Sequence, residues 1–97
     1  MNISVSFGKM AIDIARYLQN HGIDPTRIDI DDDGISIDWY DGQNHRIILF
    51  YRYMIDDLVL IKEINGVREK RYEFTNLNDV YQQIIYIINH TKPYRLF

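Results

Sequence analysis

The fold is decided by residues 45–74, HRIILFYRYMIDDLVLIKEINGVREKRYEF, which read as three consecutive antiparallel strands. Within this stretch, Asn65-Gly66 stands between the β-branched residues Ile64 and Val67. Asn-Gly between two apolar runs is the preferred sequence of a type I′ hairpin turn, because both central residues need a positive φ angle. The stretch therefore predicts a tight hairpin with Ile64 opposite Val67.

The same turn predicts the register of the two strands that it joins. Counting outward from the turn sets Glu63 opposite Arg68 and Lys62 opposite Glu69, which gives two oppositely charged cross-strand pairs. This register divides the apolar side chains between two faces. One face carries Val59, Ile61, Tyr72 and Phe74, and the other carries Leu58, Leu60, Ile64 and Val67.

The preceding strand is apolar on both of its sides. Ile47, Leu49 and Tyr51 point one way, whereas Ile48 and Phe50 point the other way, between Arg46 and Arg52. A strand of this kind is typical of a sheet centre that is covered on both faces. Two arrangements satisfy this pattern. One helix covers each face, or both helices cover one face and leave Ile48, Phe50, Leu58 and Leu60 for a partner chain.

Two amphipathic segments predict the helices. Residues 8–21 place Ala11, Ile14, Ala15 and Leu18 at helical spacing and end at Gly22, a typical residue after a helix C-terminus. The final helix is predicted to begin near Asn76 or Asn78 and to end before Pro93, followed by an apolar tail, residues 94–97, that docks on the domain.

Two further strands are predicted between the first helix and residue 45. Residues 27–31 and 35–39 alternate strictly and are joined by Asp32-Asp33-Gly34, and a second turn follows at 41–44. Their expected inward residues are Ile28, Ile30, Ile35, Ile37 and Trp39. The predicted fold is an α+β domain spanning residues 1–97, a five-stranded antiparallel β-meander flanked by an N-terminal and a C-terminal α-helix.

Composition limits the classes of protein to consider. With 97 residues, 46% of them apolar, the chain suits one domain with one core. It contains no cysteine, and residues 1–10, MNISVSFGKM, lack the features of a signal peptide. We therefore expect a cytoplasmic protein without disulfides or membrane association. The net charge of −3 favours neither an acidic DNA mimic nor a generally basic nucleic-acid binder.

The sequence offers little support for a metal site or a catalytic site. Asp29-Ile30-Asp31-Asp32-Asp33-Gly34 matches the opening of a calcium loop, D-x-D-x-D-G, but Tyr40 stands where the bidentate Glu should be. Strands rather than helices flank the segment, so Asp31–Asp33 are expected to form a solvated hairpin turn. The three histidines lie on separate elements without metal-binding spacing. We expect no metal, no cofactor and no enzyme activity.

Basic and aromatic residues in the three strands suggest one candidate function. The nucleic-acid-binding set would be Arg46, Arg52, Arg68, Lys70, Arg71 and Tyr53, since arginine and tyrosine on a sheet can neutralise phosphates and stack on bases. Interleaved Glu63, Glu69 and Glu73 weaken this interpretation, because charged residues commonly protect an edge strand from aggregation.

The apolar outer side of the sheet suggests another function, which the sequence favours. The predicted partner-binding set is Arg46, Ile48, Phe50, Arg52, Leu58 and Leu60, an apolar patch with a basic rim. We therefore predict a non-enzymatic protein-binding module: a small adaptor, an immunity-type protein or an inhibitor of a larger enzyme, of the kind that phages and mobile elements encode. The partner would be another protein or a second copy of the chain in a homodimer, and nucleic acid is the alternative.

Overall fold

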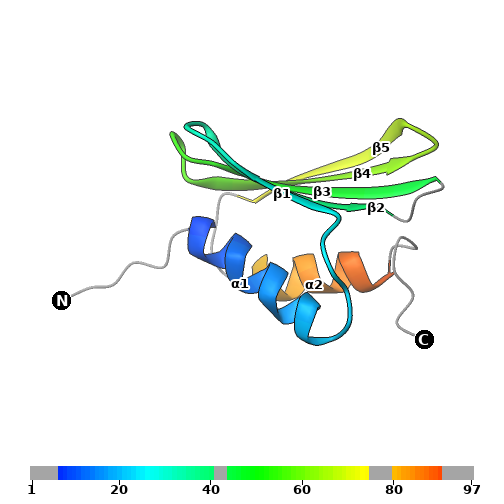
Figure 1. The fold of residues 1–97 in the computed structure, drawn as a ribbon. Helices are drawn as coiled ribbons and strands as arrows, with labels where there is room; N and C mark the ends of the chain where they lie inside the picture. The colour runs from blue at the N-terminus through cyan, green and yellow to red at the C-terminus, as the bar shows by residue number, and fades with distance from the viewer. Residues whose placement is uncertain (1–6, 41–43, 75–79, 91–97) are drawn as a thin grey trace.

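The computed structural model describes residues 7–40, 44–74 and 80–90, which form two helices and five strands (Figure 1). In chain order these are α1 (Phe7–Asn20), β1 (Arg27–Ile30), β2 (Gly34–Tyr40), β3 (His45–Arg52), β4 (Asp57–Ile64), β5 (Val67–Phe74) and α2 (Val80–His90). The strands form one antiparallel sheet in the order β1-β2-β3-β4-β5. The predicted α+β meander between an N-terminal and a C-terminal helix is confirmed.

Both helices lie on the same face of the sheet (Figure 1). Helix α1 packs against β2, β3 and β4 and also against α2. Of the two arrangements that the sequence left open, the structure therefore has the one in which a single face carries both helices. We call the opposite side of the sheet the outer face.

Helix α1 buries one apolar stripe and ends where its sequence predicts. Ala11, Ile14 and Leu18 are fully buried on this stripe. At the C-terminus the backbone N–H of Ile23 donates to Leu18 O at 2.9 Å and that of Gly22 donates to Gln19 O at 3.1 Å. These two bonds satisfy carbonyl groups that the helix leaves without partners, in the pattern of a Schellman motif.

The β4–β5 hairpin has the predicted turn but not the whole predicted register. Asn65 and Gly66 have φ angles of 55° and 77°, and Ile64 faces Val67. Glu63 faces Arg68, as predicted. A β-bulge then makes Glu69 an extra residue, so Lys62 faces Lys70 and the predicted Lys62–Glu69 register is wrong, although Lys62 Nζ still forms an ion pair with Glu69 Oε1 at 3.7 Å. A bulge turns the side chains beyond it to the other face. The predicted grouping of Tyr72 and Phe74 with Val59 and Ile61 is therefore also wrong, because Tyr72 and Phe74 face Leu60 and Leu58.

The turn between β3 and β4 sets which residues of β4 enter the core. Arg52 faces Asp57 across this turn, which places Leu49 opposite Leu60 and Tyr51 opposite Leu58. Leu58 and Leu60 are therefore fully buried beneath the helices, and their predicted position on the outer face is wrong. Val59 and Ile61 take that position, opposite Phe50 and Ile48.

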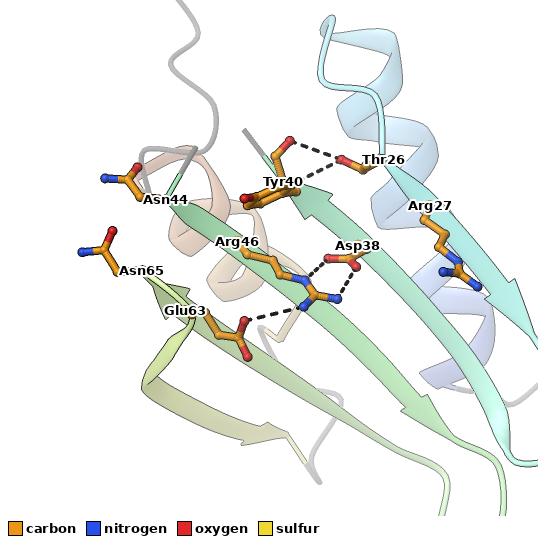
Figure 2. Close-up of a pocket in the computed structure, with 9 residues that line it drawn as sticks. Thr26, Arg27, Asp38, Tyr40, Asn44, Arg46, Glu63 and Asn65 are labelled. Carbon is orange, nitrogen blue, oxygen red and sulfur yellow. Dashed lines mark hydrogen bonds and ion pairs between the residues drawn. The ribbon is translucent and has the colours of Figure 1, made fainter. Parts of the chain in front are cut away.

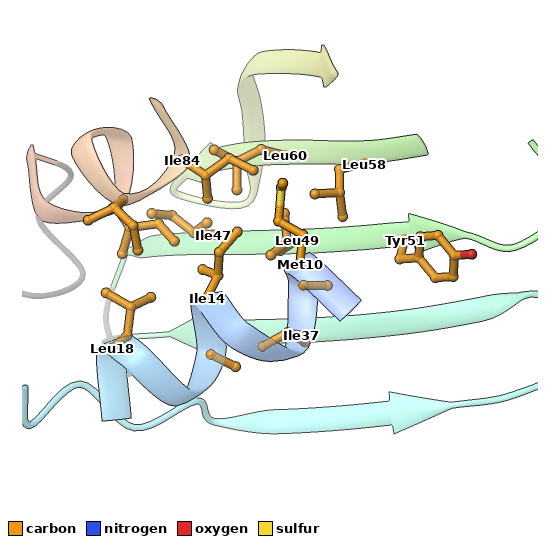
Figure 3. Packing of buried hydrophobic residues seen from close by; sticks show 14 of the residues in the cluster. Met10, Ile14, Leu18, Ile37, Ile47, Leu49, Tyr51, Leu58, Leu60 and Ile84 are labelled. Atoms are coloured by element: carbon orange, nitrogen blue, oxygen red, sulfur yellow. The ribbon is translucent and has the colours of Figure 1, made fainter. Parts of the chain in front are cut away.

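The core lies between the helices and the inner face of the sheet (Figure 3). Ile14, Leu18 and Ile84 of the helices contribute to it, as do Leu49 and Leu60 of the sheet. Trp39 and Ile37 are fully buried, as predicted. Ile28 and Ile30 on edge strand β1 stand opposite Ile37 and Ile35, so they point to the inner face as predicted. Ile35 is partly buried against the core, whereas Ile28 and Ile30 are 47% and 72% exposed and do not join it. Strand β1 lies beyond the strands against which α1 packs.

Several predictions fall on residues outside the described ranges. They are the helix start at Asn76 or Asn78, the first three residues of the turn at 41–44, and the docked tail, residues 94–97.

Candidate protein-binding face

The outer face has an apolar centre formed by the two central strands. Ile48 and Phe50 on β3 stand opposite Ile61 and Val59 on β4. Val59 is buried among its neighbours, whereas Ile48, Phe50 and Ile61 are half-buried, and both described helices lie on the opposite side of the sheet. These four residues form a continuous apolar patch in the middle of the uncovered face.

Charged side chains border the patch at the end nearest the β4–β5 turn. Arg46 Nε and Nη2 donate to the two carboxylate oxygens of Asp38 at 2.8 and 2.6 Å, and Arg46 Nη1 lies 3.7 Å from Glu63 Oε1 (Figure 2). The hydrogen bond with Asp38 raises the pKa of the Arg46 guanidinium above its ordinary value, despite opposing desolvation. Arg46 is thereby fixed as a cation between two carboxylates, one on each neighbouring strand.

A second charged cluster borders the other end of the patch. Arg52 Nε donates to Asp57 Oδ1 at 2.8 Å, and Arg52 Nη2 contacts both Asp57 Oδ2 and Glu73 Oε1. Arg71 Nη2 lies 3.2 Å from the same oxygen of Glu73. The carboxylate of Asp57 is almost completely buried, and its two-point pairing with Arg52 satisfies both oxygens. The hydrogen bond with Asp57 raises the pKa of Arg52 above its ordinary value.

Two shallow hollows open on this face. One, of about 290 Å³, lies between Phe50, Val59, Ile61 and the arginines of the second cluster. The other, of about 340 Å³, runs from Phe50 toward Met54 and Ile55 in the β3–β4 turn, where Met54 is 85% exposed. Phe50 lines both hollows, so it is the apolar side chain best placed to contact a partner.

A third hollow, of about 320 Å³, lies at the end of the first charged cluster (Figure 2). Asp38, Arg46 and Glu63 form its floor, and Thr26 and Tyr40 close one side, where Thr26 Oγ1 accepts a hydrogen bond from Tyr40 N at 2.9 Å. Both arginines that line this hollow, Arg27 and Arg46, form ion pairs with carboxylates of the chain, so the hollow is poorly suited to bind an anion.

Four of the six residues of the predicted partner-binding set lie on this face: Arg46, Ile48, Phe50 and Arg52. Leu58 and Leu60 belong to the core instead, and the sequence analysis missed Val59 and Ile61 as their replacements. The opposite charges of Arg52 and Asp57, which flank a four-residue turn, were the signal that could have set this register.

The structure divides the predicted nucleic-acid-binding set. Arg46, Arg52, Arg68 and Arg71 project from the outer face, whereas Lys70 lies on the helix side, with its Nζ 4.9 Å from the Tyr72 ring centroid. Tyr53 lies in the β3–β4 turn and is exposed. On the outer face, Arg46, Arg52 and Arg71 form ion pairs with carboxylates of the chain, which leaves little unbalanced positive charge for phosphates.

The calcium-like segment forms a hairpin turn. Asp31 Oδ1 accepts hydrogen bonds from the backbone N–H groups of Asp33 at 2.8 Å and Gly34 at 3.1 Å. Its carboxylate thus stabilises the turn directly, as aspartate commonly does. Within the described ranges, no group of three or more His, Asp or Glu side chains is arranged to hold a metal ion.

No helix among residues 7–40, 44–74 and 80–90 is both long and apolar enough to span a membrane. Comparisons with family models, curated proteins and solved structures found no match to this chain. The case for a function therefore depends on the geometry of the outer face.

Proposed function

We propose that this chain is a non-enzymatic protein-binding module that docks a partner chain on its outer face. The proposal rests on the apolar patch of Ile48, Phe50, Val59 and Ile61, which charged residues surround on the face that neither of the two described helices covers. Protein interfaces commonly combine an apolar centre with a polar rim in which arginine is enriched. A small adaptor, an immunity-type protein or an inhibitor would each use such a face.

The charge pattern favours a protein partner over a nucleic acid. Arg46 and Arg52 each make a two-point contact with an aspartate of the same chain. Binding to phosphates would have to compete with these contacts, whereas a protein surface can add to them with its own charged groups. The proposal therefore expects no binding of mixed-sequence DNA or RNA even at low salt, where phosphate contacts are strongest.

Affinity capture from lysate of the source cells tests the proposal. Three immobilised baits are compared: the wild type, Phe50→Asp on the outer face, and Tyr86→Asp at an exposed position of α2 as a matched control. We expect the wild-type and Tyr86→Asp baits to retain the same protein and the Phe50→Asp bait to lose it. A cellular copy of this chain counts as such a protein. Equal retention by all three baits, or retention of nothing beyond blank resin, would overturn the proposal.

A further inference from the structure

The registers of the sheet place the outward side chains in rows that cross the strands. From β2 to β5 the rows are Tyr40–Arg46–Glu63–Arg68, Asp38–Ile48–Ile61–Arg71 and Ser36–Phe50–Val59–Glu73, and a fourth row, Gly34–Arg52–Asp57, ends at β4. The line between β3 and β4 divides each row into two halves. Across this line Arg46 mirrors Glu63, Arg52 mirrors Asp57, and Asp38 mirrors Arg71.

We infer that the partner is a second copy of this chain, an inference that rests on the proposed function. The two copies would pack sheet against sheet, related by a two-fold axis that runs along the strands between β3 and β4. This rotation sets each residue against its mirror position in the partner. Arg46 then faces the partner's Glu63, Asp38 faces the partner's Arg71, and Ile48 packs on the partner's Ile61. Every charged residue of the four rows meets an opposite charge or a neutral group.

The charges also select this axis over the other simple two-fold arrangement. A two-fold axis across the strands, between the rows of Ile48 and Phe50, would bring Arg46 against the partner's Arg52. It would likewise bring Glu63 against the partner's Asp57. Like charges placed together at an interface are strongly unfavourable. Of these two axes, the one along the strands makes the face complementary to itself, as a two-fold interface requires.

The size of the facing area fits a weak dimer. About the axis between β3 and β4, strands β2–β5 lie opposite a mirror strand of the partner and β1 does not. These four strands, the longest of eight residues, have a flat area of roughly 500 Å² at strand spacings of about 4.8 Å and rises of about 3.3 Å per residue. Two such faces would bury roughly 1,000 Å², the least area expected of a specific interface. We therefore expect a weak dimer that dissociates at concentrations on the order of micromolar or above.

Charge reversal in trans tests both the partner and the axis. Arg46→Glu and Glu63→Arg each place two like-charged contacts in their own homodimer. In a mixture of the two variants, every position 46 faces a position 63 of opposite charge. We expect each variant alone to be a folded monomer of 11.7 kDa by light scattering, with at least tenfold weaker self-association, and the equimolar mixture to regain twice that mass.

A second variant pair and a control complete the design. Asp38→Arg and Arg71→Glu repeat the experiment in another row, should either member of the first pair fail to fold. The control variant Lys70→Glu, changed on the helix side of the same sheet, should dimerise as strongly as the wild type.

Three outcomes would overturn the inference: wild type monomeric at every concentration up to about 1 mM, single variants that remain dimeric, or mixtures that remain monomeric. If the wild type is monomeric but Phe50-dependent capture of another protein persists, self-association is wrong and the proposed function stands. If capture does not depend on Phe50, the proposed function itself fails.

Discussion

Adjacent residues of β4 contribute to different surfaces of the molecule. Leu60 is fully buried beneath the helices, whereas Ile61 is half-buried on the outer face. The same alternation separates Leu49 from Phe50 on β3. A substitution at Leu60 or Ile61 removes apolar contacts, but of these two residues only Leu60 is fully buried among packed neighbours. The loss of folding stability on substitution therefore distinguishes a side chain in the core from one on the outer face.

Alanine substitutions at Leu60 and Ile61 should lower the stability of the protein by unequal amounts. We expect Leu60→Ala to lower the free energy of unfolding by about 2–5 kcal/mol, because it opens a cavity in a packed core. Ile61→Ala should cost less than half as much in the isolated monomer. Urea unfolding at low protein concentration measures both values. Equal losses would mean that the outer face is covered in the monomer.

The phenol of Tyr51 provides a prediction about pH. Burial, followed by a hydrogen bond with Asp56, raises the pKa of Tyr51 above its ordinary value of 10.0. Above pH 10 the unfolded chain loses this proton before the folded chain does, so stability should fall as the pH rises toward the folded-state pKa. The stability of Tyr51→Phe should fall less steeply over this range. Parallel stability–pH curves for the two proteins would contradict this prediction.

At the scale of elements, turns and bulges determine which face each strand presents. Gly34 begins β2 at a close approach to β3, where a Cβ atom would overlap the carbonyl oxygen of Tyr51. Tyr53 N donates a hydrogen bond to Asp33 O at 2.9 Å, so the β1–β2 and β3–β4 turns adjoin. This end of the sheet is therefore held by backbone contacts that admit no side chain at residue 34.

Alanine at Gly34 should destabilise the protein more than alanine at Gly22. At Gly22, where φ is 84°, a Cβ atom would meet open space, so the cost is backbone strain of about 1 kcal/mol. At Gly34 the backbone must also move, so the loss should be at least about 2 kcal/mol. Thermal unfolding of both variants checks the order. A reversed order would show that the two turns are not in close contact.

Much of the element order was predictable from local patterns. Helical spacing in 8–21 and Asn65-Gly66 specified α1 and the β4–β5 hairpin because short-range geometry determines both. The bulge at Glu69 was not predictable, because charged residues on both sides of an edge strand fit either register. The side of the sheet taken by each helix was also undetermined, since apolar residues occupy both faces of β3 and β4.

The candidate site was predictable only in part, for the same reason. Arg46, Ile48, Phe50 and Arg52 follow from the alternation of β3 alone. Assigning Val59 and Ile61 rather than Leu58 and Leu60 to the outer face required the register across the β3–β4 turn. The side chains of β4 do not reveal this register by themselves, because both of these pairs are apolar.

At the scale of the whole molecule, residues 7–40, 44–74 and 80–90 form a two-layer structure in which both helices lie on one side of the sheet (Figure 1). Two copies joined through their outer faces would form four layers, with the helices outermost and the two sheets inside. Aligned sheets pack about 10 Å apart, with side chains of the facing surfaces interdigitated. This assembly would remove the apolar patch from water and keep every charged neighbour of the patch paired.

The solution mass across a dilution series, for wild type and Phe50→Asp, tests this account most directly. We predict that the wild-type mass falls from twice 11.7 kDa to 11.7 kDa on dilution. Phe50→Asp should remain at 11.7 kDa throughout, with an unchanged circular dichroism spectrum, because a charge at the patch centre opposes burial without disturbing the core. A wild type that is monomeric at all concentrations, or a variant that unfolds, would contradict the account.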